Sequence, residues 1–100
     1  MQPERRRIPT AVIDKLLLDM LFEEFAIWEK IQDGRLTSEP LPKSARPSTS
    51  WPGSFSQIIK HRLPNGKHVV TTHRVVAPDG IIHHQDAKGI RLRDVRLWRR

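Results

Sequence analysis

Two tight-turn sequences in the second half of the chain constrain its fold more than any other feature. Pro64-Asn65-Gly66-Lys67 contains the Asn-Gly pair that two-residue hairpin turns favour, because both central residues need a positive φ. In Ala77-Pro78-Asp79-Gly80, the proline presets φ and the glycine takes a left-handed conformation. Strand-like segments flank both turns, and apolar residues alternate with arginines in residues 90–98. We therefore expect residues 55–100 to form an antiparallel β-meander of three to five strands.

The first third of the chain has helical periodicity. It predicts one long helix over residues 10–34, with Thr10 as its N-cap and Gly34 in the left-handed position after its end. One broad apolar face is predicted to pack on the sheet: Ile13, Leu16, Leu17, Met20, Leu21, Ile27, Trp28 and Ile31. A narrower set is predicted to lie beside it, towards solvent: Leu18, Phe22 and Phe25.

The apolar surface of this helix is wider than the stripe of about 100° that a surface helix needs. Three arrangements would cover the excess: a second copy or another protein, the remainder of the chain, or a membrane surface. The polar side of the helix is acidic, whereas membrane-surface helices carry Lys and Arg there. We expect a homodimer or heteromer formed through the helix, and no membrane contact.

Length and composition define the domain organisation and exclude several classes of protein. A chain of 100 residues makes one domain and is too short for a dinucleotide-binding or barrel enzyme. We divide it into a basic N-terminal tail (1–9), the helix (10–34), a Pro/Ser-rich connection (35–54) and the sheet (55–100). The predicted fold class is α+β, with one long N-terminal helix packed on the meander. Acidic residues interrupt the apolar stretch, so we expect neither a membrane span nor a signal peptide, and a cytoplasmic location.

The first turn also predicts which side chains share a face of the sheet. Centring the hairpin on Asn65-Gly66 pairs Phe55 with Val76, and the face with more large apolar groups is expected to cover the helix. The opposite face then carries Lys60, Arg62, Thr71 and His73, and the last strands add Arg91 and Arg93. Pairing Ala77 with Ile81 across the second turn makes His83 a diagonal neighbour of His73.

Positive charge is concentrated in the sheet half of the chain. The net charge of the whole chain is +7, yet the predicted helix is acidic, so the excess of Lys and Arg lies in residues 34–100 and at Arg5, Arg6 and Arg7. Such segregation is typical of surfaces that bind phosphate backbones. We interpret the chain as a small nucleic-acid-binding module, with RNA expected ahead of DNA. Its expected contacts are Lys60, Arg62, Thr71, His73, Arg91, Arg93, Arg5, Arg6 and Arg7.

Two other functions remain open at this stage. In a metal-independent ribonuclease, His73 and His83 would transfer protons and Lys60 would stabilise charge at phosphorus. A helix followed by a basic sheet resembles, in architecture only, the ribonuclease toxins of the barnase and colicin types. In a protein-interaction module, such as a small inhibitor or accessory subunit, the basic surface would face an acidic partner.

Metals and cofactors are not expected from the spacing of the histidines. His83 and His84 are adjacent and so would point to opposite faces of a strand. The chain has no cysteine and no pair of histidines at helical ligand spacing, which excludes a disulfide scaffold, a Cys-ligated zinc site and a thiol nucleophile.

Overall fold

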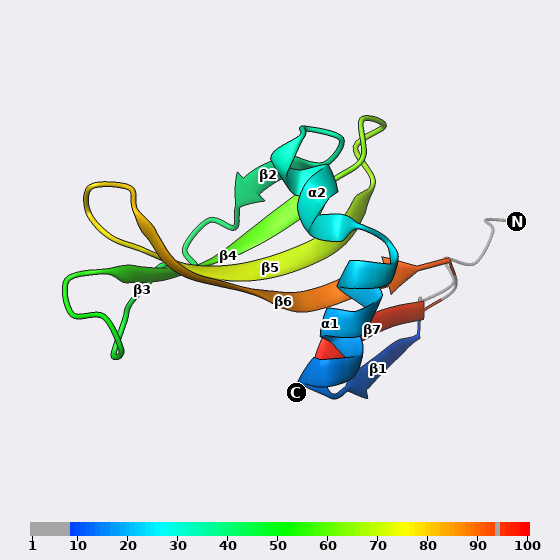
Figure 1. Cartoon of the computed structure of the whole chain (residues 1–100), viewed down its shortest axis with the longest axis horizontal. Coiled ribbons are helices and arrows are strands. Elements are labelled where there is room, and N and C mark those ends of the chain that lie inside the picture. The colour runs from blue at the N-terminus through cyan, green and yellow to red at the C-terminus, as the bar shows by residue number, and fades with distance from the viewer. Residues whose placement is uncertain (1–8, 94) are drawn as a thin grey trace, which may run out of the picture.

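A seven-stranded mixed sheet with two short helices on one face makes up the protein (Figure 1). The computed structural model describes residues 9–93 and 95–100. The strands lie in the order β1-β7-β6-β5-β4-β2, and β3 pairs with β4. Their bounds are β1 Thr10–Ile13, β2 Thr37–Pro40, β3 Arg46–Pro47, β4 Phe55–Arg62, β5 His68–Val76, β6 Ile82–Leu92 and β7 Val95–Arg99. The helices are α1 Lys15–Glu24 and α2 Ile27–Gln32. Neither is long or apolar enough to cross a membrane.

The predicted fold class, one long helix on a meander of three to five strands, is wrong. Residues Thr10–Ile13 form an edge strand, β1, that pairs in parallel with β7. The β-branched residues Thr10, Val12 and Ile13 suit this conformation. Ala26 adopts a left-handed conformation with φ 51° and separates α1 from α2. The resemblance to ribonuclease toxins depended on a single long helix, which the structure does not contain within the described residues.

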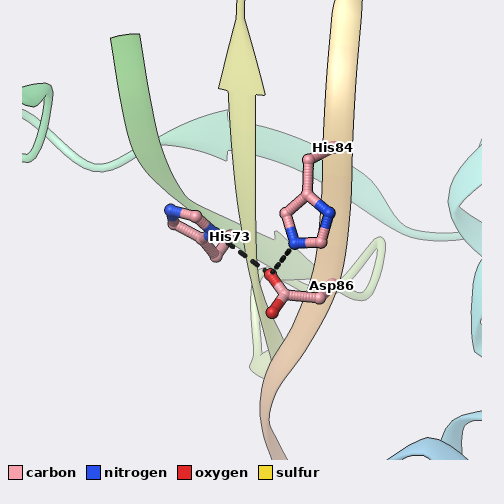
Figure 2. A group of neighbouring side chains, drawn as sticks. All are labelled: His73, His84 and Asp86. Atoms are coloured by element: carbon pink, nitrogen blue, oxygen red, sulfur yellow. Dashed lines mark hydrogen bonds and ion pairs between the residues drawn. The ribbon is translucent and has the colours of Figure 1, made fainter. Parts of the chain in front are cut away.

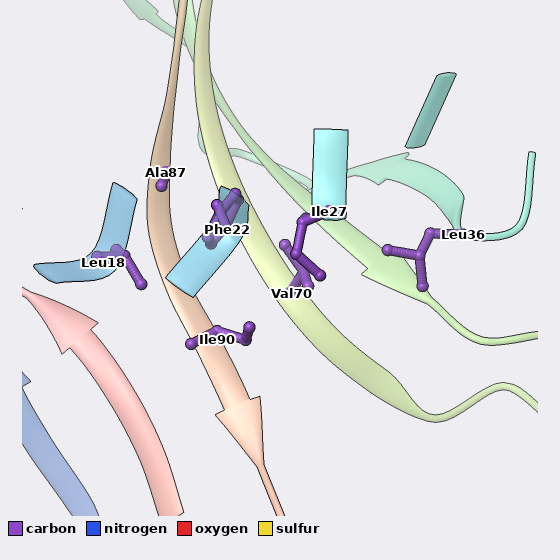
Figure 3. Packing of buried hydrophobic residues seen from close by; sticks show 7 residues of the cluster. All are labelled: Leu18, Phe22, Ile27, Leu36, Val70, Ala87 and Ile90. Atoms are coloured by element: carbon purple, nitrogen blue, oxygen red, sulfur yellow. The ribbon is translucent and has the colours of Figure 1, made fainter. Parts of the chain in front are cut away.

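The buried side of α1 differs from the predicted one, although Leu21 packs against the core and Phe25 is exposed as expected. Leu18 and Phe22, predicted to face solvent, are fully buried against Val70, Ala87 and Ile90 of the sheet (Figure 3). Leu16, Leu17 and Met20, predicted to be buried, are 73%, 46% and 56% exposed. The prediction treated residues 10–34 as one continuous helix and averaged the direction of all its apolar residues. Because the helix breaks at Ala26, Ile27, Trp28 and Ile31 are out of phase with α1. Partner contact through the exposed residues stays a prediction.

The expected register of the first hairpin is confirmed over most of its length. Phe55 pairs with Val76, and the pairing continues in step until His61 opposite Val70. A bulge then pairs Arg62 with His68. Ile59 and Val70 are buried, and Val70 belongs to the core cluster beneath the helices, so the predicted face does cover them.

The register between β5 and β6 differs from the prediction by one residue. Val76 pairs with Ile82, but Val75 pairs with His84, so His83 is the extra residue of a bulge. Because of this bulge, His84 lies on the same sheet face as His73, where the prediction had placed His83. Strand β6 also continues through Asp86, which pairs with His73.

The Pro/Ser-rich connection is anchored to the sheet. It contains β2 and β3, both paired with β4, and Leu36 at its start is buried in the core. Gly34 has φ 85°, which confirms the left-handed position predicted after the helix.

Candidate functional site

The sheet face opposite the helices carries two clusters of polar side chains. Alternation along the strands puts His73 on this face, because its neighbour Thr72 is fully buried on the core side. We call the first group the histidine cluster: Ser56, His73, His84, Asp86 and Arg99. We call the second the arginine cluster: Lys60, Arg62, His68, Arg91 and Arg96.

The histidine cluster spans four adjacent strands, β4, β5, β6 and β7, and Figure 2 shows His73, His84 and Asp86 at its centre. The Nδ1 atom of His73 lies 3.0 Å from Oδ1 of Asp86, and Nε2 of His84 lies 3.6 Å from the same oxygen. The Nε2 atom of His73 lies 2.9 Å from the hydroxyl of Ser56. The second Asp86 oxygen, Oδ2, accepts a hydrogen bond from Arg99. One carboxylate therefore organises both imidazoles.

The charge state of Asp86 determines how these hydrogen bonds run. Burial acts to raise the pKa of Asp86, but the hydrogen bond and charge of Arg99, together with those of His73, outweigh it and hold the pKa below its usual value. With the carboxylate ionised, Nδ1–H of His73 donates to Asp86 and the Ser56 hydroxyl donates to Nε2. This tautomer leaves Nε2 as a proton acceptor, as a general base requires.

The histidine cluster opens into a cleft of about 450 Å³. One wall is the segment from Pro47 to Trp51, which includes three consecutive hydroxyl-bearing residues at 48–50. The indole of Trp51 stacks on His83 and His84, with ring centroids 5.8 and 5.9 Å apart. The Pro/Ser-rich connection thus supplies an aromatic platform beside two titratable rings.

The arginine cluster brings like charges together on the same face. Arg91 and Arg96 lie directly opposite each other on β6 and β7, an arrangement that is unfavourable without a compensating anion. His68 borders them and bonds the Thr71 hydroxyl at 2.9 Å. Burial lowers the pKa of His68, and the charges of Lys60, Arg62 and Arg96 lower it further. Within residues 9–93 and 95–100, the carboxylate of Glu39, 3.8 Å from Arg62, is the one acidic group paired with this cluster.

No family model, curated protein or solved structure matches this chain.

The structure brings together some of the predicted site residues and separates others. Lys60, Arg62, His73 and Arg91 lie on the face opposite the helices, as expected, but Thr71 is 3% exposed and serves His68 rather than a ligand. In the predicted catalytic set, Lys60 and His73 share a face as diagonal neighbours, whereas His83 is the extra residue of the bulge and stacks on Trp51. Arg93 is exposed in the turn after β6, and Arg5, Arg6 and Arg7 lie outside the described residues.

The sequence interpretation missed Ser56, Asp86 and Arg99, together with the role of Trp51. A signal for Asp86 was present, because His84 and Asp86 are separated by one residue and share a face of any continuous strand. Arg99 and Trp51 come from segments distant along the chain, and no local pattern connects them to His73.

Proposed function

We propose that this protein binds the phosphate backbone of single-stranded RNA through the sheet face opposite its helices. The observation that supports the proposal most strongly is the arginine cluster, in which Arg91 and Arg96 oppose each other beside Lys60 and Arg62. Guanidinium groups pair with phosphate oxygens in a bidentate manner, and a bound phosphate would relieve their repulsion. The Nε atom of Arg91 is buried and has no hydrogen-bond partner within the described residues.

Single-stranded RNA is preferred over duplex DNA because the same sheet face also carries the cleft lined by Trp51. Unpaired bases stack on aromatic rings, and the half-buried ring of Trp51 lines the cleft. A duplex keeps its bases stacked internally and would gain nothing from this platform.

The test measures the affinity for a short, fluorescently labelled single-stranded RNA across a range of salt concentrations. We expect log affinity to fall linearly with log salt, and replacement of Arg91 or Arg96 by Gln to reduce that slope by about one. Arg35→Gln is the matched control, because Arg35 bonds Asp33 beyond α2 and lies outside the arginine cluster. Salt-independent binding, or an equal effect of Arg35→Gln, would refute the proposal.

A second candidate function, metal-independent RNA cleavage, is favoured by the pair of imidazoles in the cleft. The rings of His73 and His84 have centroids 6.1 Å apart, and Ser56 and Asp86 fix the tautomer of His73. We infer that His73 would take the 2′-hydroxyl proton and His84 would protonate the leaving oxygen. The protein should then cleave RNA in EDTA, and His73→Ala and His84→Ala should each abolish cleavage while His83→Ala preserves it. RNA that stays intact at high protein concentration rules this candidate out.

A further inference from the structure

We propose that His73, His84 and Asp86 bind one divalent transition-metal cation in the cleft beside Trp51. The proposal is independent of RNA binding, because it rests on the histidine cluster rather than the arginine cluster. Sequence spacing predicted no metal site, since His83 and His84 point apart. Strand pairing nevertheless places His73 of β5 beside His84 and Asp86 of β6.

Two of the three distances between donor atoms are close to the spacing of a coordination sphere. Metal bonds of about 2.0–2.2 Å place neighbouring ligand atoms roughly 3–3.5 Å apart. The Asp86 Oδ1 atom lies 3.0 Å from His73 Nδ1 and 3.6 Å from His84 Nε2, and all three donors lie within 4.8 Å of one another. A cation among them would replace the direct contacts between histidine and carboxylate without a rearrangement of the strands.

The outer contacts of these side chains are those that metal ligands need. Ligating histidines donate their second ring N–H to a fixed acceptor, and His73 has the Ser56 hydroxyl 2.9 Å from its Nε2 atom. Arg99 bonds Oδ2 of Asp86, which orients the carboxylate and leaves Oδ1 directed at the histidines. Asp86 is 8% exposed, and its ionised form is the one that binds cations.

The donor set selects a class of cation. Two imidazoles and one carboxylate suit Zn²⁺, Fe²⁺ and Ni²⁺, whereas Mg²⁺ and Ca²⁺ prefer oxygen donors throughout. Three protein ligands leave coordination positions open, and these would face the cleft. We therefore expect Zn²⁺ to bind in preference to Mg²⁺.

Calorimetric titration of the chelator-treated, RNA-free protein with Zn²⁺ tests the site. His84 is 43% exposed at its side chain, so His84→Ala should leave the fold intact while it weakens Zn²⁺ binding at least about 100-fold. His83→Ala is the matched control, because it removes the adjacent histidine and should leave the affinity unchanged. With the metal on Nδ1, the ring proton of His73 moves to Nε2 and the Ser56 hydroxyl accepts it, so Ser56→Ala should weaken binding about 10-fold.

Co²⁺ provides a second readout, because its visible absorption reports the ligand geometry directly. Tetrahedral or five-coordinate Co²⁺ bands that vanish in His84→Ala and persist in His83→Ala would support the assignment, and circular dichroism confirms that each variant is folded. Absence of Zn²⁺ binding in the micromolar range would overturn it, and so would equal weakening by His83→Ala and His84→Ala. Either result would make the histidine cluster an ion-pair network of Asp86 with Arg99 and His73.

Discussion

Replacing Phe22 with alanine should lower the free energy of unfolding by about 3–5 kcal/mol, the cost of emptying a large buried site. Phe22 is fully buried and its ring lies 5.3 Å from that of Trp28. It joins α1 to the sheet through the same cluster as Leu18, Val70 and Ile90. Residues 9–93 and 95–100 contain few other large buried side chains, so the sheet cannot collapse around the cavity without moving the helix. Urea denaturation followed by tryptophan fluorescence measures the loss.

Phe25→Ala is the matched control, since it removes the same side chain three residues further along. Phe25 is 42% exposed, and we expect its replacement to cost about 1 kcal/mol or less. The comparison tests the orientation of α1 directly. Equal losses for the two variants, or a larger loss for Phe25→Ala, would contradict the packing in which Leu18 and Phe22 face the sheet.

The orientation of α1 shows why helical periodicity was an incomplete guide to this fold. Within α1 alone, Leu18, Leu21 and Phe22 have the spacing of a buried stripe. Nothing in the sequence around Ala26 indicates a left-handed residue, so the two helices were treated as one. The apolar residues after Ala26 then shifted the predicted direction of the buried stripe away from Leu18 and Phe22. The strand β1 was also hidden, since its partner β7 lies at the other end of the chain.

Local chemistry did predict the hairpin between β4 and β5. The Asn65-Gly66 turn and the alternation beside it are contained in neighbouring residues, and they were sufficient to pair Phe55 with Val76. A bulge has no comparable signature. The extra residue at His83 shifted every later pair of β6, and so the sequence predicted a basic histidine-bearing face but chose the wrong second histidine.

The protein should lose stability as the pH falls from about 6.5 to about 4, because of His61. This histidine is 1% exposed and bonds Thr72 at 2.7 Å and Ser38 at 3.0 Å. Burial lowers its pKa to about 4, and the charges of His68 and Arg74 act in the same direction against a backbone hydrogen bond at Thr37. An unfolded histidine has a pKa near 6.5, so between the two values the unfolded chain binds the additional proton. Stability is therefore complete above about pH 6.5, and about 3 kcal/mol is lost by pH 4.

Urea denaturation of the wild type and of His61→Gln across this pH range isolates the contribution of this one side chain. Glutamine keeps hydrogen-bonding capacity towards Thr72 and Ser38 but does not titrate, so the variant should lose up to about 3 kcal/mol less between pH 6.5 and 4. His83→Gln removes an exposed histidine instead and should follow the wild-type profile. If the His61→Gln profile runs parallel to that of the wild type, then His61 is protonated in the folded protein at ordinary acidity. The buried contact between β2 and β4 would in that case accommodate a charge, and the acid sensitivity of the protein would have to come from His68 or the carboxylates.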